Sequence, residues 1–141
     1  MKNIMAVSIY KIANQLLRRG KFEEAVLRYK EVVKLDPLNT KAFSNLGVAF
    51  KNLKLYKEAI DAFEKALKLD PKNAIMFNNL GNVYTACGDF EKAIKHYERA
   101  IELRPKYVDA MRNYGSVLFF TGKTEEALRI NIKLEKLKHE S

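Results

Sequence analysis

The sequence has few of the residues that cross-link, interrupt or anchor a chain. A single cysteine, Cys87, excludes an intramolecular disulfide and fits a reducing compartment, so we expect a cytoplasmic protein. There are only three prolines and six glycines, so their positions are informative. No apolar run approaches 18 residues, and no membrane span is therefore expected. Lys11 interrupts the mildly apolar N-terminus, which is predicted to be a helix rather than a signal peptide.

Acidic residues are also in deficit. The 26 Lys and Arg against 17 Asp and Glu give a net charge of +9. This balance favours acidic partners or nucleic acid, and a lysine-rich solvated surface is an equal alternative. Because acids are interspersed with the lysines and no basic stripe with interleaved aromatic residues stands out, we do not expect nucleic-acid binding.

Motifs that carry chemistry are missing as well. The sequence contains no carboxylate pair, Gly-rich phosphate loop or metal-ligand cluster. Cys87 stands beside Gly88 at the end of a predicted helix, His96 occupies a predicted surface position, and His139 lies in the tail. We therefore expect a protein that is not an enzyme and that needs no cofactor and no metal.

What the sequence does contain is a period of 34 residues. Three sets of residues follow it: Gly47, Gly81 and Gly115; Ala25, Ala59, Ala93 and Ala127; and Pro37, Pro71 and Pro105. A period of this length indicates stacked supersecondary units. With the glycine at position 8, the repeats are 6–39, 40–73, 74–107 and 108–141, after a leader of residues 1–5.

These repeats resemble the tetratricopeptide repeat (TPR) family. The resemblance rests on large apolar residues at positions 4, 7 and 11, small residues at 8 and 20, an aromatic at 24 and Pro at 32, for example Phe77, Leu80, Gly81, Tyr84, Ala93, Tyr97 and Pro105. It implies an all-α fold, a right-handed superhelix of four helix–turn–helix hairpins whose first helices line a concave groove. It also implies that Gly81 and Ala93 form the closest crossing of the two helices in a hairpin.

The helix boundaries can be predicted from the residues alone. Position 15 lies in the turn of each hairpin and is glycine except for Lys54, which would be disfavoured by about 1 kcal/mol if it were left-handed. Asn39-Thr40 and Asn73 are suitable caps for the helices that follow them.

Asparagines recur at positions 6 and 9, on the face of the first helix opposite its apolar side. An amide offers both a donor and an acceptor, so stacked asparagines could hold a peptide backbone; alternatively, asparagine is simply the family's commonest choice there. Five cations, Lys11, Arg18, Lys41, Lys51 and Arg112, stand against Asp109 on the same face. The predicted peptide-binding residues are Asn14, Lys41, Asn45, Asn78, Asn79, Asn82, Arg112 and Asn113.

A carboxylate clamp for chaperone tails is not predicted. In the resembling subclass it needs cations where repeats 1–3 have Tyr10, Ile75 and Asn79, and where repeats 2–4 have Ser44 and Asp109. The sequence therefore predicts an adaptor that binds an extended acidic segment of another protein, without chaperone-tail specificity.

The last repeat departs from the pattern. Its packing positions 24, 27, 28 and 32 hold Asn131, Leu134, Glu135 and His139. Ile130 and Ile132 occupy positions that are mostly polar in the other repeats. Either both are exposed and make the protein a self-associating scaffold, a homo-oligomer joined through its last helix, or that helix is rotated and buries them. Phe119 and Phe120 either anchor a ligand or pack on neighbours.

Overall fold

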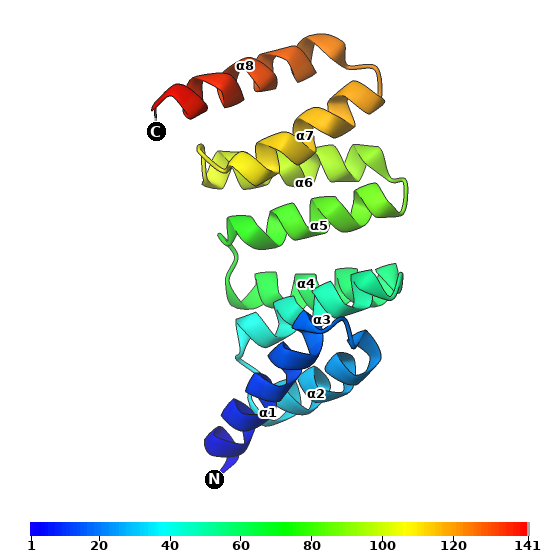
Figure 1. Cartoon of the computed structure of the whole chain (residues 1–141), viewed down its shortest axis with the longest axis vertical. Coiled ribbons are helices and arrows are strands. Elements are labelled where there is room, and N and C mark those ends of the chain that lie inside the picture. The colour runs from blue at the N-terminus through cyan, green and yellow to red at the C-terminus, as the bar shows by residue number, and fades with distance from the viewer. Residues whose placement is uncertain (141) are drawn as a thin grey trace. The chain divides into compact units, whose positions relative to one another are not determined.

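The computed structural model describes residues 1–140, which contain α-helices and no β-strand (Figure 1). The helices in this range are α1 (Lys2–Arg18), α2 (Phe22–Leu35), α3 (Thr40–Asn52), α4 (Tyr56–Leu69), α5 (Ala74–Ala86), α6 (Phe90–Leu103), α7 (Val108–Phe120) and α8 (Thr124–Glu140). Consecutive helices pair as α1·α2, α3·α4, α5·α6 and α7·α8. The predicted all-α fold of four hairpins is confirmed.

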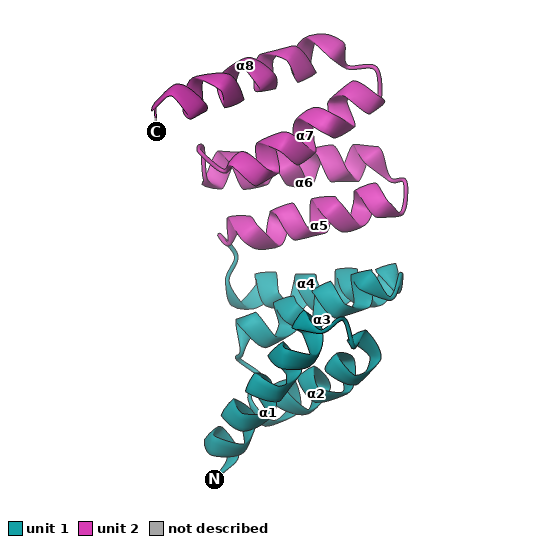
Figure 2. Cartoon of the chain, in the orientation of Figure 1, with its two compact units in different colours: residues 1–71 teal, residues 72–141 magenta. Residues whose placement is uncertain are grey.

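The chain divides into two compact units, each of which contains two hairpins (Figure 2). Unit 1, residues 1–71, contains α1–α4, and α2 packs on α3. Unit 2, residues 72–141, contains α5–α8, and α6 packs on α7. Among residues 1–140, no helix has both the length and the apolar character needed to cross a membrane.

Asparagine side chains begin two of the first helices. Oδ1 of Asn39 accepts a hydrogen bond from the backbone N–H of Ala42 at 3.0 Å, and Oδ1 of Asn73 accepts one from Ile75 at 3.0 Å. Both predicted caps are confirmed, because each satisfies a backbone donor that has no partner within its helix. Thr40, the other predicted candidate, is instead the first residue of α3.

Proline ends the second helices of the first three hairpins. α2, α4 and α6 each end two residues before the proline at position 32, which cannot continue a helix. α8 has His139 at this position and continues to Glu140. The last helix is therefore 17 residues long, against 14 in the other three hairpins.

The glycine at position 8 lies against the side chain at position 24 of the same hairpin. A Cβ atom on Gly47 would lie 2.7 Å from the Phe63 ring, and one on Gly81 would overlap the Tyr97 ring more closely still. The predicted partner of Gly81, Ala93, is buried, but the nearest atoms belong to Tyr97. The flat Tyr97 ring thus occupies the space that a Cβ on Gly81 would take, and the crossing of Gly81 with Ala93 stays a prediction.

The last hairpin makes this contact with a different residue. A Cβ on Gly115 would lie 2.9 Å from Cγ2 of Ile130, since position 24 is Asn131, which is exposed. Ile130 is consequently only 5% exposed, whereas Ile132 is 48% exposed. The rotated-helix alternative is thus correct for Ile130, and the expectation that both isoleucines are exposed was wrong.

Replacement of Gly81 by alanine should destabilise the protein. The added methyl group must displace the buried Tyr97 ring, and overpacking of this kind costs roughly 1–3 kcal/mol. Urea unfolding of Gly81→Ala, Tyr97→Leu and the double variant measures the coupling between the two positions. The double variant should lose less stability than the sum of the single variants, and simple additivity would contradict the close contact.

Replacement of Lys54 by glycine should stabilise the protein. Lys54 has φ 61°, while its counterparts Gly20, Gly88 and Gly122 have φ 73°, 81° and 82°. A side chain in this conformation costs roughly 1–2 kcal/mol, so Lys54→Gly should raise the free energy of unfolding by about 1 kcal/mol. Lys54→Ala is the matched control, because alanine retains the Cβ atom. An equal gain from alanine would show that removal of the lysine charge, rather than backbone strain, is the cause.

Candidate functional site

The predicted site residues lie on one side of the first helices, at positions 2, 5, 6, 9, 12 and 13 of each repeat, which we call the asparagine face. In unit 1, α1 contributes Asn14 and α3 contributes Lys41 and Asn45; in unit 2, α5 contributes Asn78, Asn79 and Asn82, and α7 contributes Arg112 and Asn113. The side chains of Lys41 and Arg112 are exposed, and the asparagines are half-buried except for Asn78, which is buried.

In unit 1, the asparagines connect the two hairpins through a tyrosine. Oδ1 of Asn14 accepts a hydrogen bond from the Tyr29 hydroxyl at 2.6 Å and a second from Nδ2 of Asn45 at 3.2 Å. The same Asn45 nitrogen donates to the Tyr10 hydroxyl at 3.4 Å. These bonds tie together α1, α2 and α3.

Unit 2 repeats this arrangement. Oδ1 of Asn82 accepts from the Tyr97 hydroxyl at 2.7 Å and from Nδ2 of Asn113 at 3.1 Å. Asn113 also donates to Oδ1 of Asn78 at 3.2 Å, and Nδ2 of Asn78 donates to the Tyr107 hydroxyl at 3.4 Å. The asparagines of α5 and α7 are thus structural links between consecutive hairpins as well as surface groups.

The sequence pattern predicts only a packing role for the aromatic at position 24 and does not predict the hydrogen bonds of its hydroxyl group. The sequence does contain a sign of these bonds, because the residues at positions 24 and 9 of a repeat vary together. Repeats 1 and 3 combine Tyr at position 24 with Asn at position 9, whereas repeat 2 combines Phe63 with Val48, neither of which offers a polar side-chain atom. Asn79 makes no side-chain hydrogen bond to the described residues of unit 2.

The two asparagine faces differ in charge. The face of unit 1 carries Lys11, Arg18, Lys41 and Lys51 and no acidic residue at these positions. None of these four cations has an ion-pair partner within residues 1–140. On the face of unit 2 the Arg112 guanidinium lies 3.7 Å from the Asp109 carboxylate, and both side chains are exposed. The predicted excess of positive charge therefore belongs to unit 1, because the charges on unit 2 cancel.

The face of unit 2 is instead aromatic at the end near the α7–α8 turn. Phe119 and Phe120 are 70% and 74% exposed. The ring of Phe120 lies 5.2 Å from that of Phe90, centroid to centroid. A pocket of about 310 Å³ opens beside them, lined by Thr85, Phe90, Ser116, Val117 and Phe120. Phe120 therefore both packs on a neighbour and remains accessible to a ligand.

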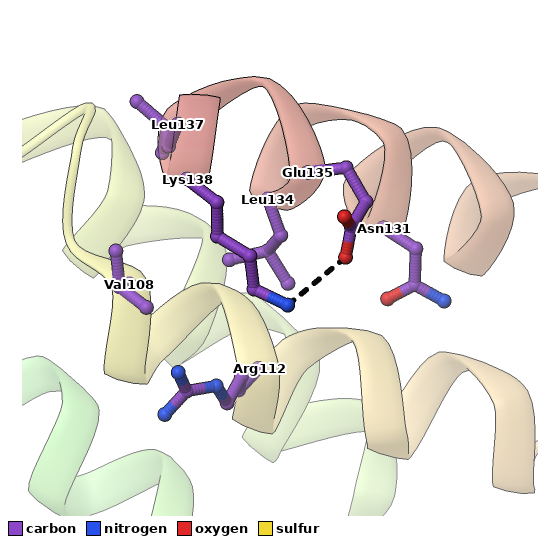
Figure 3. Close-up of a pocket in the computed structure, with 7 residues that line it drawn as sticks. All are labelled: Val108, Arg112, Asn131, Leu134, Glu135, Leu137 and Lys138. Atoms are coloured by element: carbon purple, nitrogen blue, oxygen red, sulfur yellow. Dashed lines mark hydrogen bonds and ion pairs between the residues drawn. The ribbon is translucent and has the colours of Figure 1, made fainter. Parts of the chain in front are cut away.

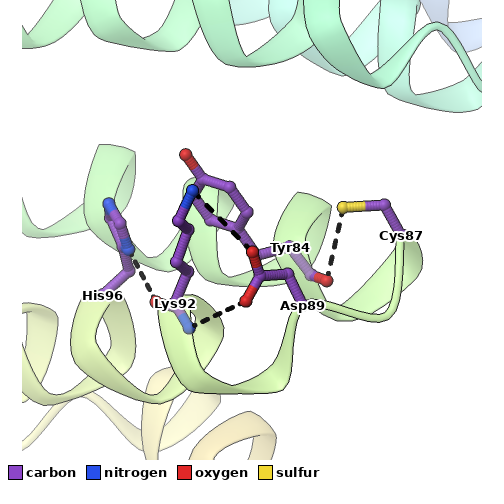
Figure 4. A network of polar contacts seen from close by, with 5 residues as sticks. All are labelled: Tyr84, Cys87, Asp89, Lys92 and His96. Carbon is purple, nitrogen blue, oxygen red and sulfur yellow. Dashed lines mark hydrogen bonds and ion pairs between the residues drawn. The ribbon is translucent and has the colours of Figure 1, made fainter.

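Cys87 and His96 make bonds to the main chain and not to each other (Figure 4). The Cys87 thiol donates to the carbonyl of Tyr84 at 3.5 Å, and Nδ1 of His96 lies 2.7 Å from the carbonyl of Lys92. The His96 ring is half-buried beside Tyr84, at 5.0 Å between centroids. Within residues 1–140, no group of three or more His, Cys, Asp or Glu could hold a metal ion.

The predicted self-association residues do not form a single surface. Ile130 packs at Gly115, and only Ile132 is available to solvent. A contact between copies that uses both isoleucines is therefore excluded by the packing of α8 on α7.

Comparison with known families decides the classification. Three family models described as tetratricopeptide repeat match residues 10–74, 74–107 and 96–129. The chain belongs to the tetratricopeptide repeat family. No curated protein matches the TPR chain by sequence.

Solved structures of TPR proteins superpose on the chain over most of its length. The crystal structure of MamA is 27% identical, with a TM-score of 0.88, and covers 96% of this chain and 81% of its own. YrrB, described as a TPR protein with an unusual peptide-binding site, is 29% identical, with a TM-score of 0.77, over 93% and 68%. The first TPR of Spaghetti (RPAP3), bound to the HSP90 peptide SRMEEVD, is 26% identical, with a TM-score of 0.75, over 79% and 89%.

Alkaline pH should destabilise the tyrosine–asparagine link of unit 1. Burial away from water raises the pKa of Tyr29 to about 12, from the ordinary 10.0. The folded state then holds a proton that the unfolded state releases, so the stabilisation is complete below pH 10 and is lost as the pH rises from 10 to 12. A shift of this size corresponds to about 2–3 kcal/mol. Urea unfolding across this range should show a smaller loss for Tyr29→Phe than for wild type, and equal slopes would contradict this assignment.

Proposed function

We propose that this TPR protein is a non-catalytic adaptor that binds an extended acidic segment of another protein on its asparagine face. The observation that carries the proposal is the charge of the unit 1 face, where four cations without ion-pair partners flank the Asn14–Asn45 pair. An acidic segment would be attracted by this field and would associate faster at low salt.

The asparagine amides supply the contacts to the peptide backbone. The carbonyl oxygen of Asn14 is held by Tyr29 and Asn45, which fixes the orientation of the Asn14 amide. Its Nδ2 group and the Oδ1 of Asn45 are then a donor and an acceptor in fixed positions, as a peptide backbone requires. Binding loses less conformational entropy when such groups are already ordered.

The unit 2 face would contribute an apolar contact rather than charge. The pocket between Phe90 and Phe120 suits a large apolar side chain, and Asn79 retains an amide without a hydrogen bond inside the unit. Aromatic anchors with convergent polar groups are typical of sites that bind peptides. A ligand segment that contacts the unit 2 face would therefore carry at least one large apolar residue.

Two of the similar structures support a peptide ligand in general terms. The description of YrrB names a peptide-binding site, and that of RPAP3 names a bound peptide, SRMEEVD. This chain has Tyr10, Ile75 and Asn79 where the carboxylate clamp for such tails requires cations, so SRMEEVD serves as a negative control rather than as the proposed ligand.

Selection from a display library of ten-residue random peptides should enrich sequences rich in Asp and Glu. The double variant Lys41→Glu, Lys51→Glu should weaken binding of the selected peptide at least tenfold and flatten its salt dependence, because two attractive charges become repulsive. Fluorescence anisotropy at several salt concentrations measures both effects.

The matched control for this experiment is Lys34→Glu, Lys57→Glu, which makes the same change of charge on α2 and α4, away from the asparagine face. An equal loss of binding in both double variants would mean that net charge, and not this face, attracts the peptide. Enrichment of peptides without acidic residues would contradict the proposal.

A further inference from the structure

A cleft of about 550 Å³ lies between α7 and α8, beside the C-terminal half of α8 (Figure 3). Its lining residues are Val108, Arg112, Asn131, Leu134, Glu135, Leu137 and Lys138. Valine and two leucines give it apolar walls, and Figure 3 shows Lys138 bonded to Glu135 across one side of it. The asparagine face shares only Arg112 with this cleft, so the cleft is a second candidate site.

The corresponding place in the preceding hairpin is occupied. Tyr107, in the connection between α6 and α7, packs with Ala100 and is only 9% exposed. Its hydroxyl accepts a hydrogen bond from Nδ2 of Asn78 at 3.4 Å. The guanidinium carbon of Arg104 lies 4.7 Å from the centre of its ring, which is a cation–π contact.

Adding 34, the repeat length, to the residue numbers around Tyr107 gives residues that line the cleft. Five lining residues are equivalents of residues that contact Tyr107 or belong to the apolar cluster around it: Val108 of Ala74, Arg112 of Asn78, Leu134 of Ala100, Glu135 of Ile101 and Lys138 of Arg104. The α7–α8 cleft is thus the place that a tyrosine fills one repeat earlier.

The contact with Tyr107 replaces an ordinary helix cap. Tyr107 is the N-cap residue of α7 and makes no side-chain cap hydrogen bond, whereas Asn39 and Asn73, its equivalents in the earlier repeats, cap α3 and α5. An asparagine cap stabilises the start of a helix, because its side chain satisfies a backbone N–H that has no partner within the helix. The fold therefore gives up a cap at this position in favour of a tyrosine in the cleft.

Two substitutions leave the α7–α8 cleft open. α6 ends before Pro105, and the chain then turns and places Tyr107 between α5 and α6. α8 has no proline at this position and continues past it as a helix. In addition, the bulky and only half-buried Leu134 stands where the preceding hairpin has the fully buried Ala100.

We propose that the α7–α8 cleft binds a tyrosine side chain presented by an extended segment of a partner protein. The hydrogen bond and the cation–π contact of Tyr107 each have a counterpart there. The Arg112 guanidinium can donate to the phenol oxygen in place of Asn78, the Lys138 ammonium can lie over the ring in place of Arg104, and Leu134 and Leu137 supply the apolar wall.

The charged residues of the cleft favour a neutral tyrosine ring over an anionic side chain. Arg112 lies 3.7 Å from the Asp109 carboxylate and Lys138 lies 3.0 Å from Glu135, so each cation is already accompanied by an acid. A phosphorylated or carboxylate-bearing side chain would have to compete with Asp109 and Glu135 for these two cations, whereas a neutral phenol needs only one hydrogen-bond donor. The site is therefore assigned to tyrosine and not to phosphotyrosine.

The test uses the segment that fills the equivalent place, as a synthetic peptide with the sequence of residues 104–111 and blocked ends. Tyr107 is held at its own site by the chain, whereas a free peptide has no such tether, so we expect weak binding with a Kd on the order of a millimolar. Titration into the full chain, followed by NMR, should shift the methyl signals of Val108, Leu134 and Leu137 in a saturable way.

Peptide variants decide the chemistry of the site. Replacement of the tyrosine by alanine should weaken binding at least tenfold, replacement by phenylalanine should weaken it less, and phosphotyrosine should not strengthen it. The protein variant Leu137→Asp should lose the interaction, while Arg129→Asp on an exposed part of α8 should retain it, with circular dichroism showing that both remain folded. The Lys41→Glu, Lys51→Glu variant should also bind the tyrosine peptide, which separates this site from the asparagine face.

Three results would overturn the proposal. One is the absence of shifts at the cleft with several millimolar peptide. The second is equal affinity for the tyrosine and alanine peptides. The third is a set of cleft shifts that grows with protein concentration without any peptide, because the occupant would then be a second copy of the chain.

Discussion

The contact between the glycine at position 8 and the aromatic side chain at position 24 determines the geometry of the α3–α4 and α5–α6 hairpins. It lets the first helix approach until its backbone touches the ring of Phe63 or Tyr97, with no Cβ atom between them. The intrinsic cost of glycine in a helix, about 1 kcal/mol, is offset by burial of a large aromatic side chain. In the last hairpin Ile130 takes the aromatic's place, and α8 is turned by about one residue as a result.

The same aromatic position connects one hairpin to the next when it carries a hydroxyl. Tyr29 and Tyr97 pass through the hairpin core and reach Asn14 and Asn82, which in turn receive an asparagine from the following hairpin. A buried phenol must find a partner, and the amide supplies one at the edge of the asparagine face. The amides proposed to contact a peptide are thus also structural, so substitution of Asn14 or Asn82 would alter stability as well as the proposed binding. Lys41 and Lys51 are better positions at which to separate them, because they lie outside this hydrogen-bond cluster.

Repetition makes the departures of the last repeat easy to interpret. Where Pro105 turns the chain and brings Tyr107 back onto its own hairpin, His139 allows α8 to continue and leaves the equivalent cleft open. Where the other hairpins bury an aromatic at position 24, the last one exposes Asn131. In a stack of repeats each unit interacts mainly with its neighbours, so changes in one repeat alter the surface there without disturbing the others.

The sequence by itself determined the fold class, the four hairpins and most of the turns and caps, because these depend on local rules repeated at a period of 34. Asn39 and Asn73 cap helices for reasons contained within three residues, and Lys54 adopts the left-handed conformation that its glycine counterparts indicate. The partner of Gly81, the burial of Ile130 and the bonds of the asparagines required the tertiary structure. These depend on which side chain of a neighbouring helix faces each position. When a helix turns about its axis by one residue, as α8 does, a buried side chain becomes exposed and its neighbour becomes buried.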